Sequence, residues 1–433
     1  MKKTRLLFTG WICSLLLTAL GCSNPLQRAT PIPPAPSETP SPVPTATFTP
    51  SPTVSPTPVP TLTGGLQLIE LHMLDEMVGW AWTSSPARTT LLMHTDDGGN
   101  TWADVTPPGS LHYDQEDDWA FFLDGRAAWL MIQGPSDDES VLLRTQDAGE
   151  TWVSHSIEID LDRFEFEDQN DGWGLSSEVQ EESWLVRFYR TDDGGQTWTG
   201  MAVPAPPSYS EYAGDPEGFR GCDSCGDALY YDPAHVILLY SDETSTEGSL
   251  GVRLSVSLDQ GVSWEDLELS LPDPLPPGGQ VFSQWPAFVD RVNGFLSVRI
   301  TNQAFPDEAA YDLLAIYVTT DGGWTWELVS TIDNPTNELL PKVEFVSTLD
   351  GFARCGNDLC ATHDGAQTWR LVAVQAQFAP QGSGQPIFQF DFVSPQTGWV
   401  LAGSAGETEI ETSLWMTNDG GLTWSGLAPA FIP

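Results

Sequence analysis

The chain has 433 residues, with 60 acidic and 17 basic side chains and a formal net charge of −43 at pH 7. This charge argues against nucleic-acid binding, because a phosphate backbone has to be met by basic patches. The acidic surplus indicates a heavily solvated surface, or one that attracts a cation or a basic partner.

Residues 1–22 are predicted to be an export signal. Three basic residues within the first five precede an apolar run, and a small residue stands before Cys22. The stretch Ala19-Leu20-Gly21-Cys22 resembles the bacterial lipobox, in which Leu is more common than Ala at the first position. We therefore expect lipidation of Cys22, with cleavage without lipid, or a retained anchor, as the alternatives. The mature protein is expected outside the cytoplasm, held to a membrane by its acyl chains.

Residues 23–65 are expected to form an extended, semi-rigid tether. They are almost only Pro, Thr, Ser, Val and Ala, a composition that cannot form a packed core. In the polyproline conformation, at about 3.1 Å per residue, the segment would reach on the order of 100 Å. Such a length would display residues 66–433 away from the membrane.

An eight-residue pattern, Ser/Thr-x-Asp-x-Gly-x-Thr/Ser-Trp, occurs seven times along residues 66–433; we call each copy a box. Its Asp can accept backbone N–H bonds within its own turn, and its Gly permits a positive φ, so each box is predicted to be a tight hairpin between two strands. One copy has Ala366 in place of the glycine. The box aspartates and tryptophans, all expected to be structural, are Asp97, Asp147, Asp193, Asp259, Asp321, Asp364 and Asp419, and Trp102, Trp152, Trp198, Trp264, Trp326, Trp369 and Trp424.

A second motif, Gly followed by an aromatic residue, precedes most of the boxes and opens another strand. Asp-Gly or Asn-Gly steps, which favour hairpins, mark three of its copies. Each repeat can thus be written as four strands, A to D, with the box on the C–D hairpin, and the box aspartates recur every 43 to 66 residues. Seven units of four short strands predict an all-β fold, a seven-bladed β-propeller of antiparallel blades. The copies of the motif are Gly79-Trp80, Gly172-Trp173, Gly294-Phe295, Gly351-Phe352 and Gly398-Trp399.

The two motifs together resemble the Asp-box (bacterial neuraminidase repeat) propellers, and most closely the photosystem II stability/assembly factor family. The resemblance covers residues 66–433 and implies boxes at the blade periphery, away from the functional face. It also implies a non-catalytic scaffold that binds a protein client, a basic protein or a membrane-complex subunit, with no cofactor and no metal. We expect such a scaffold, as a monomer, and not an enzyme. Family members present a basic patch, whereas this domain has Lys342 and scattered arginines, so the client of that family is not carried over.

A catalytic function is the alternative to this expectation. A glycosidase needs only two suitably spaced carboxyl groups, so a carbohydrate-active Asp-box enzyme is the alternative function. A sialidase is less expected, because no Phe-Arg-Ile-Pro signature precedes the first box and the surrounding loops are acidic. A Ser or Cys nucleophile would need a neighbouring His base, and the six histidines are scattered.

Four cysteines remain after the export signal, and in an exported chain they suggest disulfides. Cys355 and Cys360 flank a predicted hairpin turn, which favours a bridge between them. Cys222 and Cys225 are expected to form a second disulfide, with free thiols or a metal site as alternatives. A zinc site would need two further ligands, which the sequence does not offer nearby.

The B–C loops carry many acidic residues, and these loops share one face in any propeller of this type. Charges distant in sequence are therefore expected to converge there as a candidate binding face for basic segments or divalent cations. Acidic loops that merely keep the protein soluble are the alternative. The residues chosen for this face are Glu181, Glu182, Asp242, Glu243, Asp307 and Glu308.

Overall fold

A computed structural model describes residues 65–85, 90–108, 119–133, 140–180, 183–201, 219–221, 228–231, 235–242, 251–259, 262–272, 280–284, 286–301, 312–333, 342–378, 386–405 and 410–432. The chain divides into two compact units, Met1–Val54 and Ser55–Pro433, and every described residue belongs to the second. The expected export signal, Cys22 and nearly all of the expected tether lie outside the described residues. Among the residues that are described, no helix is long and apolar enough to cross a membrane.

Seven separate sheets, which we call blades one to seven, follow one another along the chain. Blade one consists of β1 (Gln67–Met73), β2 (Gly79–Ser84), β3 (Thr90–Thr95) and β4 (Thr101–Asp104). Blade two consists of β5 (Trp119–Phe122), β6 (Ala128–Gln133), β7 (Ser140–Thr145) and β8 (Val153–Ile157). Blade three consists of β9 (Arg163–Phe166), β10 (Gly172–Gln180), β11 (Ser183–Thr191) and β12 (Thr199–Met201), and β13 (Phe219–Gly221) also pairs with β11.

Blade four consists of β14 (Ala228–Tyr231), β15 (Val236–Asp242), β16 (Gly251–Ser257) and β17 (Glu265–Glu268). Blade five has an interrupted first strand, β18 (Gln280–Ser283) and β19 (Ala287–Phe288), followed by β20 (Gly294–Thr301), β21 (Asp312–Thr319) and β22 (Glu327–Asp333). Blade six consists of β23 (Val343–Phe345), β24 (Gly351–Cys355), β25 (Asp358–Thr362) and β26 (Arg370–Ala373). After the short 3-10 helix η1 (Gln375–Phe378), blade seven consists of β27 (Ile387–Phe392), β28 (Gly398–Ala405), β29 (Ile410–Thr417) and β30 (Ser425–Leu427).

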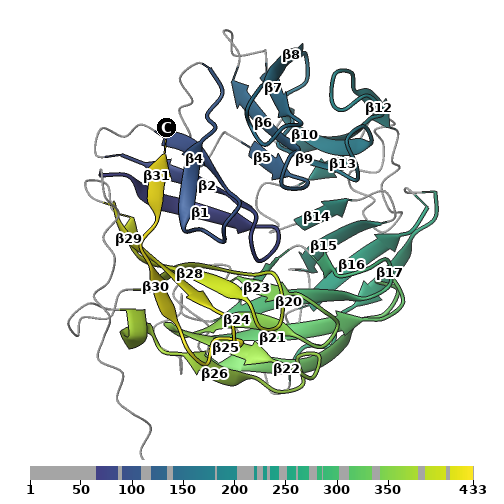
Figure 1. Ribbon diagram of the computed structural model, residues 1–433. Coiled ribbons are helices and arrows are strands. Elements are labelled where there is room, and N and C mark those ends of the chain that lie inside the picture. Colours follow the sequence, from purple (N-terminus) through teal and green to yellow (C-terminus); the bar gives the residue numbers. More distant parts are fainter. Residues whose placement is uncertain are drawn as a thin grey trace, which may run out of the picture. The chain divides into compact units, whose positions relative to one another are not determined.

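The predicted all-β, seven-bladed propeller is confirmed by this topology. Successive strands within each blade pair antiparallel. In Figure 1 the labels of β1, β5, β9 and β14 lie toward the middle of the ring, and those of β8, β17, β22 and β26 lie at its rim. The apolar core lies between blades: one cluster joins Trp80 and Leu92 of blade one to Ala128 and Leu130 of blade two.

The Gly-aromatic motif packs each blade against its neighbour. Phe392, at the end of β27, stacks on Phe352 of blade six with ring centroids 3.4 Å apart. A Cβ atom at Gly398 would overlap the Phe392 ring, so the glycine is what lets this ring lie across its own blade and reach the preceding one. The same arrangement joins Phe345 to Phe295 and Phe166 to Trp129. In blade four, which lacks the motif, His235 supplies the ring that stacks on Phe288, at 4.2 Å.

Each box forms its hairpin through the same hydrogen bonds. In blade one, Asp97 Oδ1 accepts the Thr101 N–H at 2.8 Å, and Asp97 Oδ2 accepts the Thr101 hydroxyl at 2.7 Å. Thr95 donates its hydroxyl to Asp97 Oδ1 and accepts the N–H of Gly99, which has a φ of 87°. Ala366 holds the equivalent position in blade six with a φ of 67°, a conformation that costs an L-residue energy that glycine avoids.

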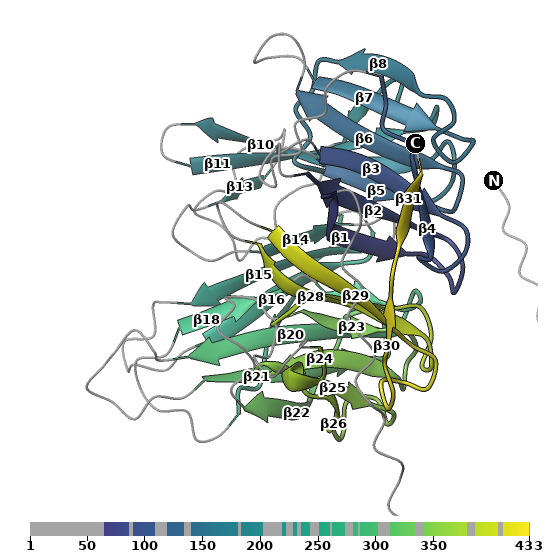
Figure 2. The same cartoon turned by 60° about the vertical axis from the view of Figure 1, so that its left-hand side comes forward.

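The C-terminal strand closes the ring. Strand β31 (Ala430–Ile432) pairs parallel with β4, the outermost strand of blade one, as Figure 2 shows. The first strand, β1, stays within blade one and pairs with β2. The first and the last strands of the described chain therefore belong to the same sheet, that of blade one.

Candidate functional site

Polar side chains interrupt the first strands of several blades at two recurring positions. These positions lie nine and seven residues before the glycine that opens the second strand. They are occupied by Glu70 and His72 in blade one, Arg163 and Glu165 in blade three, Lys342 and Glu344 in blade six, and Gln389 and Asp391 in blade seven. Because first strands are the innermost strands of a propeller, these groups are placed near its axis.

In blades six and seven these groups bond directly to the first strand of the next blade. The Phe392 N–H donates to Glu344 Oε2 at 3.3 Å, and the Met73 N–H donates to Asp391 Oδ2 at 2.6 Å. The Gln389 side chain exchanges two hydrogen bonds of 2.7 Å with the backbone of Leu71. The three first strands are thus fixed relative to one another by polar contacts.

The carboxyl group of Glu344 is close enough to Asp391 of the next blade to feel its charge. Burial raises the pKa of Glu344 to about 8; Lys342 opposes this, while the charge of Asp391 adds to it. A negative charge nearby disfavours the ionised form of a carboxyl group. With a pKa of about 8, Glu344 is protonated at neutral pH.

Lys342 provides the compensating cation. Its Nζ lies 3.4 Å from Glu344 Oε2 and donates to the Phe390 carbonyl at 2.8 Å. Burial alone would lower the pKa of Lys342, but the charges of Glu344, Asp391 and Glu70 outweigh it and raise that pKa above its usual value. Solvent still reaches 42% of the Lys342 side chain and 21% of the Glu344 side chain, so a ligand can contact both.

Glu70 and His72 add a second carboxylate to the site from blade one. His72 Nε2 lies 2.8 Å from Glu70 Oε1, with both side chains partly exposed. Lys342, Glu344, Asp391, Glu70 and His72, which we call the axial cluster, therefore combine a neutral acid, two carboxylates, an ammonium group and an imidazole. This set can donate a proton to a bound molecule at neutral pH and accept one elsewhere.

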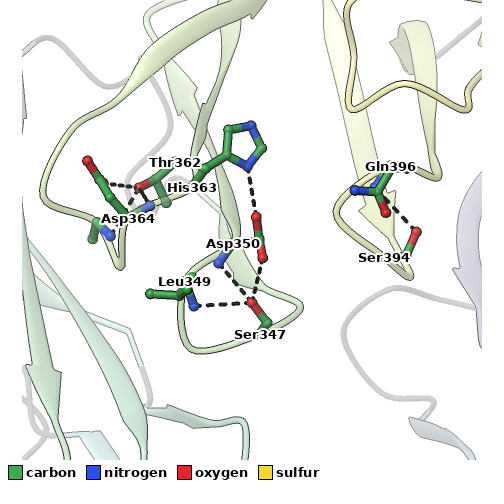
Figure 3. Close-up of polar contacts among 9 residues, drawn as sticks. Ser347, Leu349, Asp350, Thr362, His363, Asp364, Ser394 and Gln396 are labelled. Carbon is green, nitrogen blue, oxygen red and sulfur yellow. Dashed lines mark hydrogen bonds and ion pairs between the residues drawn. The ribbon is translucent and has the colours of Figure 1, made fainter.

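A Ser, an Asp and a His also meet on blade six, but in an order that does not fit nucleophilic catalysis. The Ser347 hydroxyl donates to Asp350 Oδ2 at 2.8 Å, and His363 Nδ1 lies 2.8 Å from Asp350 Oδ1 (Figure 3). The aspartate stands between the two, whereas a nucleophilic serine has to contact the histidine itself. The Leu349 and Asp350 N–H groups both donate to Ser347 Oγ, so this serine organises a turn.

None of the site residues chosen from the sequence is a member of the axial cluster. The boxes lie on hairpins between the third and fourth strands, and Cys355 and Cys360 are joined by a disulfide with Cα atoms 5.9 Å apart. Cys222, Cys225 and most of the expected acidic face (Glu181, Glu182, Glu243, Asp307 and Glu308) lie outside the described residues. Asp242 ends β15, and its place in a binding face stays a prediction. Within the described ranges, no group of three or more His, Cys, Asp or Glu side chains could hold a metal ion.

The sequence analysis missed the axial cluster, although a signal for it was present. Aligning the repeats on the Gly-aromatic motif places Glu344, Asp391, Glu165 and His72 at one shared position, seven residues before the glycine. A charged or polar residue between apolar neighbours in a predicted innermost strand points to a buried polar contact. The hydrogen-bond partners of these residues lie in adjacent blades, so the sequence of a single repeat could not predict them.

No known protein family matches the sequence, and no curated protein is significantly similar to it. The resemblance to Asp-box propellers and assembly factors therefore stays a prediction. Solved structures do share the fold, among them the GH74 xyloglucanase of Xanthomonas campestris, with 14% identity, a TM-score of 0.35, and coverage of 85% of this chain and 68% of that one. The GH93 α-L-arabinofuranosidase of Fusarium graminearum has 12% identity, a TM-score of 0.39, and coverage of 71% and 95%. A PL25 ulvan lyase has 9% identity, a TM-score of 0.45, and coverage of 83% and 94%.

These comparisons correct the expected function. We expected a non-catalytic scaffold or assembly factor, and that expectation is wrong: the structures just described are two glycosidases and a polysaccharide lyase. At such low identity the similarity establishes the fold alone. The carbohydrate-active alternative has to be argued from the site itself.

Proposed function

We propose that the protein is a carbohydrate-active enzyme, a glycosidase whose general acid is Glu344. The observation that carries this proposal is the position of Glu344, which is partly exposed, lies 3.4 Å from Lys342 and has its pKa raised to about 8. A general acid has to be protonated at the working pH and still able to release its proton, and a glycosidase obtains this by raising the pKa of one carboxyl group.

The axial cluster supplies the other groups that hydrolysis needs. Glu344 gives its proton to the glycosidic oxygen as the bond from that oxygen to the anomeric carbon breaks. Water adds its hydroxyl to the anomeric carbon, and a carboxylate takes up the remaining proton. Glu70 is the second carboxylate in this proposal, since its charge acts on the same Lys342 ammonium group.

Asp391 and Lys342 are positioning residues in this scheme. Asp391 is fixed by the Met73 N–H and raises the pKa of its partner, so it keeps the proton on Glu344. Lys342 limits that rise, because its positive charge stabilises the Glu344 carboxylate that forms when the proton leaves.

The test compares the full chain with its Glu344→Gln variant on a panel of neutral and uronate-containing polysaccharides, with release of reducing ends as the readout. A glutamine keeps an oxygen to accept from the Phe392 N–H and carries no charge, so it mimics the protonated acid without a transferable proton. We expect a loss of kcat of at least about 100-fold with little change in thermal stability.

Glu165→Gln is the matched control, because Glu165 occupies the equivalent position in blade three, outside the axial cluster. It should leave hydrolysis of neutral substrates unchanged. The proposal fails if the wild type releases no reducing ends from any polysaccharide, or if Glu344→Gln is as active as the wild type.

A further inference from the structure

The described first strands, with the adjoining Lys342, hold more carboxyl groups than cations. Two side chains, Arg163 and Lys342, are cationic. Four carry carboxyl groups: Glu70, Glu165, Glu344 and Asp391. Even with Glu344 protonated, negative charge exceeds positive charge near the propeller axis, and the acidic chain around it adds to that field.

Each of the two cations is also matched by a nearby carboxyl group. Lys342 lies 3.4 Å from Glu344 and its Nζ is 5.2 Å from the centre of the Phe390 ring. Arg163 donates from Nε to Glu165 at 3.1 Å, and its guanidinium lies 5.7 Å from the centre of the Trp173 ring. The charges of Asp391 and Glu70 also act on Lys342, so a carboxylate or sulfate that approached this cation would be repelled by both of them.

Hydroxyl groups meet no such obstacle. A sugar hydroxyl can donate to the Glu70 carboxylate and accept from the Lys342 ammonium group or from His72, and all three side chains are partly exposed. His72 also lies against the Phe122 ring, with ring centroids 5.2 Å apart, which gives this part of the site an apolar surface. Polar hydrogen-bonding groups beside an apolar surface are the usual lining of a site for a neutral ligand.

We infer that the axial cluster takes neutral saccharides and excludes those that carry carboxylate or sulfate groups. This inference rests on the proposed function, since it names the substrate class of the same site. It predicts selectivity in binding as well as in hydrolysis, so it can be judged where no hydrolysis is measured.

The experiment uses matched pairs of polymers: xyloglucan and arabinan, each beside its own carboxymethylated derivative. Affinity electrophoresis of the full-length Glu344→Gln variant measures binding without turnover, at low salt and at about 0.5 M salt, where charge effects are largely screened. We expect at least one neutral polymer to bind at both salt concentrations, and its carboxymethylated derivative to bind at least about tenfold more weakly at low salt, with a smaller difference at high salt. Binding of neither neutral polymer, or equal or tighter binding of a charged derivative, overturns the inference.

The double variant Glu165→Gln, Glu344→Gln tests the charge argument itself. The Glu165 substitution removes one negative charge from the first strands, so carboxymethylated polymers should bind about threefold to tenfold more tightly while neutral binding is unchanged. Unchanged binding of the charged polymers would contradict the inference. Hydrolysis by the wild type separates this inference from the proposed function. If the wild type hydrolyses charged polymers in preference to neutral ones, the inferred substrate class is wrong and the proposed glycosidase activity stands. If the protein binds neutral polymers selectively but hydrolyses none of them, the proposed glycosidase activity is wrong and the binding selectivity stands.

Discussion

Glu344 makes the stability of the folded protein depend on pH in a definite direction. Its folded pKa of about 8 lies above the ordinary 4.5, because burial and the Asp391 charge together outweigh Lys342. The folded state therefore keeps a proton that the unfolded chain releases. The stabilising contribution of this group is fully present below pH 4.5 and is lost as the pH rises toward 8. Lys342 stays charged throughout this window, since its pKa is raised from 10.5.

The first prediction is that Glu344→Gln removes this loss. The variant and the wild type should have similar free energies of unfolding near pH 4.5. Near pH 8.5 the variant should be the more stable by a few kcal/mol, because each unit of pKa shift corresponds to about 1.4 kcal/mol. Urea unfolding at a series of pH values measures the difference. Parallel stability curves for the two proteins would show that Glu344 titrates normally in the folded state.

At the scale of the element, the Gly-aromatic motif explains how one blade meets the next. The second prediction is that Gly398→Ala lowers stability by about 1–3 kcal/mol, because the new methyl group would overlap the buried Phe392 ring and disturb its stacking on Phe352. Gly200→Ala is the control, since a Cβ there would meet only Tyr189, at 3.8 Å. Equal effects in the two variants, measured by thermal unfolding, would count against this explanation.

The box aspartates make the stability of the folded protein depend on pH in the direction opposite to that of Glu344. Burial alone would raise the pKa of Asp419, but the Thr423 hydroxyl and N–H and the Thr417 hydroxyl lower it below its ordinary 3.8. A group of this kind stabilises the fold above that value and stops doing so as the pH falls through its folded pKa. All seven box aspartates are shifted in this direction.

The third prediction is that Asp419→Asn costs about 1–3 kcal/mol at pH 7, because the amide cannot replace all the hydrogen bonds that the carboxylate accepts. The variant should also lose stability less steeply than the wild type as the pH falls below the ordinary pKa of 3.8, because the pKa of Asp419 is lowered in the folded state. Acid unfolding followed by tryptophan fluorescence tests both statements. A variant with wild-type stability at pH 7 would mean that the box hydrogen bonds contribute nothing.

The repeats made the fold predictable, whereas the site depends on contacts that repeats do not reveal. Each box and each Gly-aromatic pair is stabilised by local contacts or by its nearest neighbour, so a single repeat carries the information. The charge of Asp391 in blade seven acts on Glu344 in blade six, and Asp391 bonds to Met73, which lies 318 residues away in the chain. The net charge of the sequence gave no sign of a protonated acid, because it counts every carboxyl group alike and says nothing about the surroundings of any one of them.

At the scale of the molecule, the seam between the last and first blades is held by polar contacts as well as by β31. Besides the bonds from Gln389 and Asp391, the Thr412 hydroxyl donates to the Leu68 carbonyl at 2.8 Å. The Trp399 indole N–H donates to the Gly98 carbonyl at 3.1 Å. The axial cluster lies beside this seam, so its geometry depends on a closed ring.

The fourth prediction is that deleting residues 430–433, which include β31, lowers the unfolding temperature and exposes blade one to proteolysis. The deletion removes the parallel pairing with β4 and leaves that edge strand open. Ile432→Ala keeps the strand and changes a side chain that is 48% exposed, so it serves as the control. Identical protease resistance of the deletion and the control would show that β31 does not close the ring.

The most direct test of the central claim is the pH dependence of kcat for hydrolysis of a neutral polysaccharide by the full chain. With Glu344 as the general acid, the rate should fall as the pH rises through about 8, where the proton that the reaction needs is lost. In Glu344→Gln the rate should be at least about 100-fold lower and should not fall through that pH. Absence of hydrolysis by the wild type at any pH, or the same alkaline decline in the variant, would contradict the account.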